Sequence, residues 1–288
     1  MASTIILKRR ITSIRNTRQI TRAMELVSAS KLRRAQEYAL LSRDYQNLAY
    51  DLLQRLNAIA EVERQPLFKK RPVKNRLYVV VTSNTGLAGA YNANVLKLLT
   101  TNLRRDEAEH VASHVITVGS KGAQFVRRLQ KVELTAVYPP FGDRPTANDV
   151  RPMLNNIIDH YRNEKVDEVQ IIFTTFRSTI SQQTTLMQIL PAPLPSDLNS
   201  NDRISNFEPD VETVVDQTAT RLIEAQLWQA VLESLASEHA MRMMATKSAT
   251  DNATDLIADY TLELNTARQA VVTQELAEIS GGVEALSE

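Results

Sequence analysis

The feature that most constrains this sequence is its C-terminal segment, in which residues 211–280 contain neither glycine nor proline. A helix rises about 1.5 Å per residue, so about 70 such residues would extend over roughly 105 Å, several times the width of a small domain. Small or apolar side chains recur three and four positions apart, as at Ala253, Ile257, Tyr260 and Leu264. This spacing draws one stripe along the helix and predicts a coiled-coil seam, not a helix buried in a globular core.

A second segment of the same kind lies at the N-terminal end, where residues 3–64 also lack glycine and proline. It predicts a helix of about 60 residues, on the order of 90 Å long, with Ile11, Thr21 and Leu32 on its seam. If the chain leaves this helix near residue 60 and returns near residue 210, the two helices run antiparallel. The numbers of facing residues then add to about 270, given a rise of about 1.5 Å per residue in both helices.

The two helices carry opposite charge. The first forty residues hold nine basic and two acidic residues, a net charge of +7, whereas residues 211–288 hold four basic and thirteen acidic ones, a net charge of −9. In the second helix, acids follow one another at i,i+4 spacing, where like charges repel by a few tenths of a kcal/mol per pair; they are Asp251, Asp255, Asp259 and Glu263. We expect the basic helix to face these acids. In the predicted register, Arg15, Arg18 and Arg22 lie within about two helical turns of Asp255, Asp251 and Lys247.

The basic segment is also compatible with a mitochondrial transit peptide, with a helix that binds nucleic acid, and with an ordinary solvated helix. The transit peptide is disfavoured because the apolar pattern continues unbroken from Leu40 to Leu56. The sequence contains no cysteine, which excludes disulfides and thiol catalysis. It also lacks any run of 18 or more apolar residues, so no membrane-spanning helix is predicted.

The middle of the chain has a different pattern, in which apolar runs typical of strands alternate with helical segments. Strands are predicted at residues 76–82, 114–118, 132–138, 168–176 and 184–190, and helices at 92–104, 123–129 and 146–163, the last capped by Thr146. Alternation of this kind predicts a mostly parallel sheet, and the short gap between the last two strands predicts an antiparallel pair at its end.

These segments together predict an α/β plus coiled-coil fold: a long antiparallel two-helix coiled coil of the N- and C-termini with an inserted Rossmann-like α/β domain. The expected domains are residues 1–66 for the first helix, 72–195 for the α/β domain, and 210–288 for the helix that pairs with the first.

No constellation for chemistry accompanies this fold. The turns at residues 85–92 and 119–122 follow strands and precede helices, yet neither matches a dinucleotide-binding or P-loop pattern, so tight βα turns are favoured over nucleotide sites. The four histidines are scattered, without the spacing of a metal site. No G-x-S-x-G motif is present. We predict no catalytic, cofactor-binding or metal-binding residue.

Several stretches closely resemble the gamma subunit of F-type ATP synthases. They are ITSIRNTRQITRAMELVSASKLRRA at 11–35, the run from LASEHAMRMMATKSATDN to TARQAVVTQELAEISGG at 235–282, GSKG at 119–122, SQQTTLMQILP at 181–191, and Phe207-Glu208-Pro209-Asp210. The sequence departs from many relatives at Asn84-Thr85, often Asp-Arg, and at Ala88, often cysteine. It also lacks the cysteine-bearing insert of chloroplast gamma subunits.

The resemblance implies a rotary central stalk of a proton-translocating ATP synthase. A ring of c subunits would turn it inside a hexamer of alpha and beta subunits, and its asymmetry would drive the catalytic sites of beta. It would not itself be an enzyme or bind a cofactor. Its partners would be alpha, beta, epsilon and the c ring, without nucleic acid, and with membrane contact only through the c ring. Its place would be the cytoplasmic face of a bacterial plasma membrane, with an organellar membrane as the alternative.

The resemblance also implies contact residues. Those toward alpha and beta are Arg9, Arg10, Met24, Arg242, Arg268, Gln269 and Glu275, and those of the foot, toward epsilon and the c ring, are Tyr38, Tyr45, Phe207 and Glu208. Packing in the helix seam is an equal alternative for Met24. Small seam residues would keep the stalk slim.

The end of the C-terminal helix gives a further expectation. In the predicted register the first helix runs out near residue 266, which leaves residues 267–286 unpaired. This segment is too apolar to stand alone in water, and Gly281-Gly282 interrupts it, so we expect another protein to enclose it. Two alternative functions stay open: a cytoplasmic coiled-coil scaffold, which would form symmetric dimers, and a nucleic-acid binder, whose affinity would fall steeply with salt.

Overall fold

The computed structural model describes residues 4–57, 65–142, 145–193 and 211–287. The chain divides into two compact units: Met1–Val27 with Met243–Glu288, and Ser28–Arg242. We call them the helical unit and the sheet unit. Helices α1 (Thr4–Asn57) and α5 (Val211–Ser287) contribute to both. Helix α5 contains the predicted segment 211–280 and continues through Gly281-Gly282 to Ser287. Helix α1 accounts for residues 4–57 of the predicted segment 3–64, and residues 58–64 lie outside the described residues.

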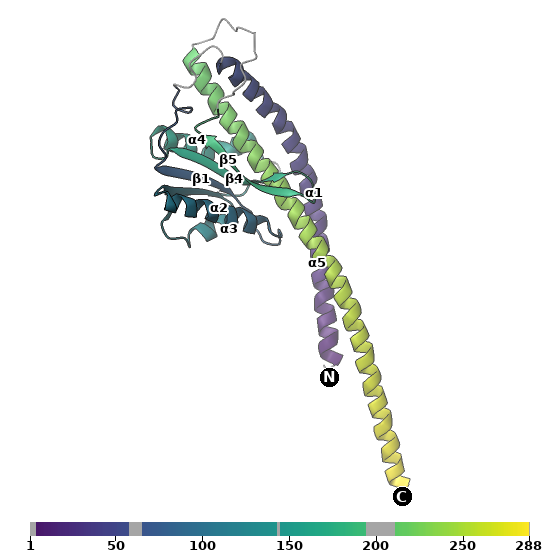
Figure 1. Cartoon of the computed structure of the whole chain (residues 1–288). Coiled ribbons are helices and arrows are strands. Elements are labelled where there is room, and N and C mark those ends of the chain that lie inside the picture. The colour runs from purple at the N-terminus through teal and green to yellow at the C-terminus, as the bar shows by residue number, and fades with distance from the viewer. Residues whose placement is uncertain (1–3, 58–64, 143–144, 194–210, 288) are drawn as a thin grey trace. The chain divides into compact units, whose positions relative to one another are not determined.

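The sheet unit contains one sheet of five strands in the order β3-β2-β1-β4-β5 (Figure 1). The strands are β1 (Asn75–Val81), β2 (Ala112–Val118), β3 (Val132–Tyr138), β4 (Glu168–Phe176) and β5 (Gln182–Leu190). Strand β1 pairs in parallel with β2 and β4, β2 pairs in parallel with β3, and β5 runs antiparallel to β4. The predicted parallel sheet with an antiparallel end is therefore confirmed.

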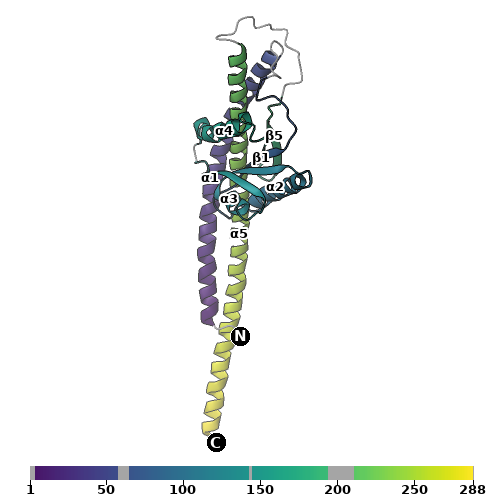
Figure 2. The same ribbon diagram turned by 90° about the vertical axis from the view of Figure 1, so that its left-hand side faces the viewer.

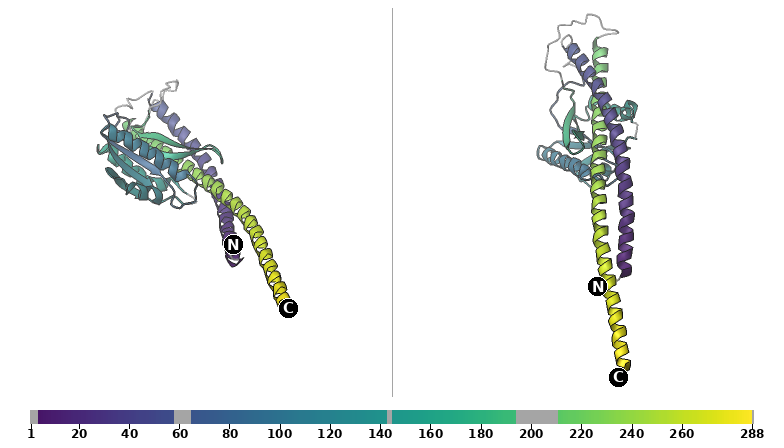
Figure 3. Two further views of the ribbon diagram at one scale, coloured as in Figure 1. Left: turned by 60° about the horizontal axis from the view of Figure 1, so that its bottom comes forward. Right: turned by 90° about the vertical axis from the view of Figure 1, so that its right-hand side faces the viewer.

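Helices cover both faces of this sheet. On one face, Tyr78 and Val80 of β1 pack with α2 (Tyr91–Ala108) and α3 (Ser120–Val126). On the other face, the alternate β1 residues pack with α4 (Ala147–Arg162) and with the first part of α5, from Val215 to Val231. Because side chains of a strand point alternately to opposite faces, the apolar run 77–81 of β1 supplies both cores. The views in Figures 2 and 3 show α2 and α4 on opposite sides of the sheet.

The start of α4 has the predicted cap. The Asp149 carboxylate accepts hydrogen bonds from the backbone N–H and the hydroxyl of Thr146, at 2.7 and 3.0 Å. Further along, α4 is joined to α5 by the ion pair of Arg151 with the buried Glu224 carboxylate, at 2.9 Å. Arg221, which lies on α5 like Glu224, binds the same carboxylate at 2.7 Å. Burial opposes ionisation of Glu224, but the two guanidinium groups outweigh it and lower the pKa of this carboxyl.

A buried charged cluster under α2 was not predicted. Arg76 of β1 forms ion pairs with Asp106 of α2 and with Glu168 of β4, the second at 2.6 Å. Asp106 also accepts hydrogen bonds from Tyr78 at 2.7 Å and Ser113 at 3.1 Å. Burial, and then the bond to Asp106, raise the pKa of Tyr78. These partners satisfy charges that would otherwise be costly inside the sheet unit.

Candidate functional site

The helical unit consists of one antiparallel pair of helices (Figure 2). Two contacts fix how its segments of α1 and α5 are aligned. The Thr250 hydroxyl donates to the Thr21 hydroxyl at 2.8 Å, and the Arg10 guanidinium lies 5.8 Å from the centre of the Tyr260 ring. The residue numbers of these two pairs add to 271 and 270, so the predicted register is confirmed.

On α5 the seam of this pair is made of small side chains, whereas α1 also buries the larger Leu7 and Ile11. Thr246, Thr250 and Ala253 are buried on α5, and Thr21 is buried on α1. The threonine hydroxyls mostly bond to their own helix, as Thr246 does to the Met243 carbonyl at 3.1 Å, which leaves their methyl groups for the seam. Small residues bring helices close together and yield a thin pair with little buried apolar area.

The charged faces of the pair are arranged differently from the prediction. The α5 acids Asp251, Asp255, Asp259 and Glu263 are exposed. Among the described residues of the helical unit, no ion pair joins these acids to the basic residues of α1, and Arg22 pairs instead with Glu25 on its own helix at 3.0 Å. The seam at positions 250, 253, 257 and 260 points elsewhere. The expectation that the basic helix faces these acids was wrong, although the register was right.

The end of α5 matches the unpaired segment that the sequence predicted. Every residue from Arg268 to Ser280 is exposed. Apolar side chains lie among them with exposures between 46% and 64%: Val271, Val272, Leu276, Ile279 and, just beyond, Val283. Isolated exposed apolar residues are common, but a continuous set on one bare helix marks an interaction surface.

The predicted contact residues of the helical unit lie apart from one another. Arg9 and Arg10 are exposed on α1, and Met24 is half-buried on the same helix. Arg268, Gln269 and Glu275 are exposed on the bare end of α5, beyond the residues that pair with α1. The structure therefore brings these residues to two separate surfaces and not to one site.

The predicted foot residues can be placed only in part. Tyr38 is half-buried on α1. Tyr45 lies within the same helix, but its side chain is outside the described part of the chain. Phe207 and Glu208 also fall outside the described residues.

Arg242 is held inside the sheet unit. Its guanidinium donates to the Glu238 carboxylate at 2.7 Å and to the Thr85 hydroxyl at 3.1 Å. Glu238 lies one turn away on α5, and Thr85 belongs to the loop between β1 and α2. Burial raises the pKa of Glu238, and the nearby charges of Arg242 and Lys31 oppose that rise. The i,i+4 spacing of Glu238 and Arg242 was a visible sequence signal for this pair.

The same face of α5 carries two buried serines that were not identified from the sequence. Ser234 accepts the backbone N–H of Thr174 at 3.3 Å, and its hydroxyl lies 2.7 Å from the Tyr91 hydroxyl. Ser237 donates to the Thr174 carbonyl at 3.0 Å. Both serines are fully buried. Nothing in the sequence alone links them to Thr174, which lies near the end of β4.

These contacts fill the place where an α/β sheet of this order usually binds a ligand. The strand order reverses between β1 and β4, and ligands of such folds occupy the crevice at the carboxyl ends of these strands. Here Ser234, Ser237 and Arg242 reach β4 and the loop after β1. The chain's own helix therefore takes up the hydrogen-bonding groups of that crevice.

The glycine turn before α3 is closed in the same way. The Gly122 N–H donates to the Thr82 hydroxyl at 2.8 Å, and the Lys121 N–H donates to the Ser83 carbonyl at 3.2 Å. A phosphate cradle needs such N–H groups pointing outward. This geometry favours the tight βα turn over a nucleotide site.

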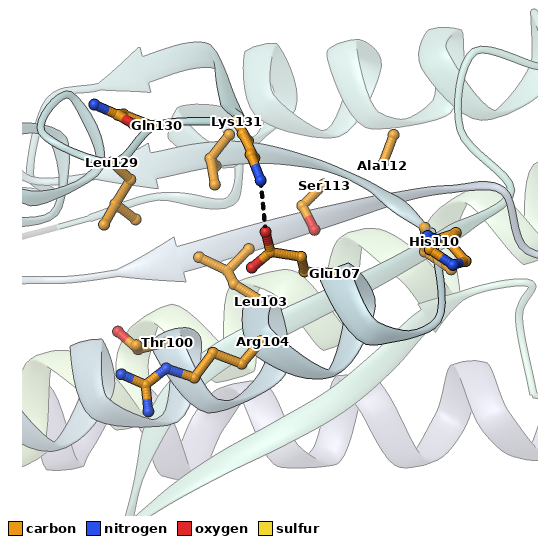
Figure 4. Close-up of a pocket in the computed structure, with 12 residues that line it drawn as sticks. Thr100, Leu103, Arg104, Glu107, His110, Ala112, Ser113, Leu129, Gln130 and Lys131 are labelled. Carbon is orange, nitrogen blue, oxygen red and sulfur yellow. Dashed lines mark hydrogen bonds and ion pairs between the residues drawn. The ribbon is translucent and has the colours of Figure 1, made fainter.

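A surface cavity of about 550 Å³ lies at the opposite edge of the sheet (Figure 4). Lys131 and Glu107 form an ion pair across it at 2.9 Å, and Arg104 and His110 line it. The hydrogen bond and charge of this pair lower the pKa of Glu107 and raise that of Lys131. The cavity is at the amino ends of β2 and β3, away from the edge where these folds place ligands.

Neither a metal site nor a membrane span was found in the part of the chain that the structure describes. No group of three His, Asp or Glu side chains there could hold a metal ion. No helix among those residues is both long enough and apolar enough to cross a membrane.

Comparisons with known proteins agree along the whole chain. A family model described as ATP synthase matches residues 3–286. The ATP synthase gamma chain of Geobacter metallireducens is 40% identical over 294 residues, with 99% of each chain covered, and that of Psychrobacter cryohalolentis is 35% identical with 100% of each covered. Among solved structures, a chain of the Euglena gracilis mitochondrial ATP synthase, described as OSCP/F1/c-ring, has a TM-score of 0.68 at 19% identity, over 99% of this chain and 94% of that one.

Proposed function

This chain belongs to the family of ATP synthase gamma chains, and from that premise we propose that it is the central stalk of a rotary ATP synthase. It couples rotation of a membrane ring to conformational change at catalytic sites carried by other subunits. It performs no chemistry itself: its relatives are named as one chain of the complex, the gamma chain.

The observation that carries this proposal is the bare end of α5. A single helix with a row of exposed apolar side chains has no stable place in water, and it fits a close-fitting sleeve lined by another protein. Contact of this apolar kind is non-directional, so the helix can turn within the sleeve without breaking specific bonds. The thin seam of the helix pair serves the same need, because a slim stalk occupies a narrow sleeve.

The sleeve is the hexamer of alpha and beta subunits, and the foot of the stalk meets epsilon and the c ring. The support is the family, together with the Euglena neighbour, whose description places F1 and a c ring in one assembly. The complex is associated with a membrane. The named relatives are bacterial, which supports the cytoplasmic face of a bacterial plasma membrane, with contact through the c ring only.

We propose the contact residues from the family resemblance, and the exposure and charge of most of them support it. Arg9 and Arg10 present exposed positive charge on α1, suited to acidic loops of beta, and Met24 lies on the same helix. Arg268 and Gln269 are exposed on the bare part of α5, where they can form directional hydrogen bonds with beta.

Four further positions complete the proposed contacts. Glu275 lies near the end of α5. Arg242 remains in the set toward beta, although its side chain is only 9% exposed and is engaged within the sheet unit. The foot contacts are Tyr38 and Tyr45 with the segment around residues 207–208, including Phe207 and Glu208.

Co-purification tests this function. The full chain is expressed with affinity-tagged beta, alpha and the membrane sector in a host without its own gamma subunit. We expect a complex with three alpha, three beta and one copy of this chain, and ATP-driven proton pumping in membrane vesicles. Purification as a symmetric dimer without alpha and beta would favour a scaffold. Salt-sensitive binding to DNA as its main interaction would favour the nucleic-acid alternative.

A further inference from the structure

In the sheet unit, one face of α5 carries a row of buried polar side chains. Ser234, Ser237, Glu238 and Arg242 follow one another at helical spacing and all lie on the side of α5 that meets the carboxyl edge of the sheet. We call these four residues the polar clasp. The part of α5 before them, from Val215 to Val231, packs on the sheet through apolar side chains.

The clasp binds both backbone polar groups of one residue of the sheet, Thr174. The last paired residues of β1 and β4 are Val80 and Ile172, so Thr174 lies past the end of that ladder. Its N–H donates to Ser234 and its carbonyl accepts from Ser237. Beyond the last residue of β4 that pairs with β1, the two α5 hydroxyls therefore bind the backbone of β4 in place of β1. Arg242 extends the contact to Thr85 in the loop that follows β1.

The apolar and polar parts of α5 restrain different motions. Apolar packing holds the helix on the sheet and opposes large rotations, which would expose buried side chains, but a small rotation about the helix axis changes the buried area little. Hydrogen bonds weaken steeply when their angle changes. Buried bonds are also costly to break, because the separated groups find no water. The bonds of Ser234 and Ser237 therefore define the rotational setting of α5 on the sheet.

We propose that the polar clasp is the element through which torque passes between the α/β sheet and α5, with Ser234 and Ser237 as positioning residues. The inference rests on the proposed rotary function. Without the two hydroxyls, α5 can turn slightly against the sheet when the stalk is loaded, and part of each ATP-driven step is lost before it reaches the foot.

The test compares the Ser234→Ala/Ser237→Ala double variant with wild type in the complete enzyme, in membrane vesicles. ATP hydrolysis and proton pumping are measured together while the opposing proton gradient is increased. We expect the ratio of protons pumped to ATP hydrolysed to fall roughly twofold or more at high load, because two buried directional bonds are lost, and to fall less at low load. Reduced stability would lower the amount of coupled enzyme and so lower the ratio by the same factor at low and high load, which leaves its dependence on load unchanged.

A matched control and a local readout complete the experiment. Thr218→Val removes a buried hydroxyl of α5 that donates to the Val214 carbonyl of its own helix, and we expect it to keep the wild-type ratio. Hydrogen exchange of the Thr174 amide in the full chain should be faster in Ser234→Ala than in wild type. If the double variant does not assemble, Ser237→Ala alone is used, since it leaves the Ser234 bond in place.

The outcomes separate the inference from its premise. Failure of wild-type vesicles to pump protons would remove the rotary function itself. If the wild type pumps, an unchanged load dependence in the serine variants would overturn the clasp alone. Unchanged exchange at Thr174 would also overturn it, because the hydroxyls would then not hold that strand.

Discussion

Replacing Gly119 by alanine should destabilise the sheet unit by about 2–6 kcal/mol. Gly119 precedes α3 with φ 86° and ψ 152°, a region that only glycine occupies readily, so a side chain there costs about 1–3 kcal/mol. A Cβ atom at this position would also lie 2.2 Å from the Thr82 carbonyl oxygen and 2.9 Å from that of Ser83. Both neighbours are backbone atoms that cannot move aside freely, and overpacking of this kind costs about 1–3 kcal/mol more.

The assay uses the single tryptophan of the chain. Trp228 packs against the core of the sheet unit, so its fluorescence reports urea unfolding of that unit. A loss of this size should lower the midpoint by roughly 1–3 M urea. Gly86→Ala is the matched control, because nothing lies within 4 Å of its added Cβ, and we expect its midpoint to stay near wild type. Equal midpoints for the two variants would refute this reasoning. Nucleotide binding at micromolar concentration by the isolated wild-type chain would refute the interpretation of residues 119–122 as a tight βα turn.

Three further outcomes follow from the structure. Thr250→Val removes the hydrogen bond to Thr21 and should lower the free energy of unfolding by about 1 kcal/mol. If Thr21→Val and the Thr21→Val/Thr250→Val double variant lower it by the same amount, the loss comes from the bond between the two hydroxyls. Glu224→Gln should lower stability at pH 7 by about 1–2 kcal/mol. Since the folded-state pKa of that carboxyl is lowered, its contribution is present above the ordinary value of 4.5 and disappears as pH falls further, so urea midpoints of variant and wild type should converge in acid. Arg268→Ala should slow ATP turnover without preventing assembly, whereas deletion from Val283 should leave substantial coupled synthesis; the reverse pattern would contradict our assignment of the end of α5.

Much of the architecture could be predicted because it depends on local pattern and chain geometry. The two segments without glycine or proline could only be long helices, and the positions where the chain leaves and re-enters them determine an antiparallel register. The contacts of Thr21 with Thr250 and of Arg10 with Tyr260 agree with that register to within one residue. Likewise, the alternation of apolar strand segments with helical segments sufficed to predict the sheet, because residues 77–81 of β1 are apolar on both faces and form a recognisable buried strand.

The charged face was misjudged for a specific reason. A run of acids at i,i+4 identifies one face of a helix but not the direction in which that face points. Direction is decided by the seam, because burial of Thr250 and Ala253 stabilises the pair and exposed ion pairs contribute only about 0–1 kcal/mol each. Asp251 and Asp255 alternate with the seam residues and so are turned away from it.

The polar clasp could not be predicted because its partners are set by tertiary structure. Ser234 and Ser237 look like ordinary small residues of a slim helix. Their bonds to Thr174 exist only because β1 ends before β4 does and α5 crosses at that point. The intramolecular partners of Arg242 also depend on tertiary structure. The family resemblance suggested a contact with another subunit, whereas the fold places its guanidinium between Glu238 and Thr85.

The part of α5 in the sheet unit and the part in the helical unit therefore differ in the side chains that they bury. Near its start, large apolar side chains such as Leu222 and Leu227 are fully buried against the sheet, and serine hydroxyls add direction to that packing. In the helical unit the buried residues of α5 are small, namely Thr246, Thr250 and Ala253, so each contributes less than the roughly 1.5–3 kcal/mol of a buried leucine or valine; only α1 adds larger buried side chains there among the described residues, at Leu7 and Ile11. A helix pair with so little buried area gains much of its stability from what surrounds it. The same small residues that let the stalk fit a sleeve thus make it depend on that sleeve, which links the stability of this unit to assembly of the complex.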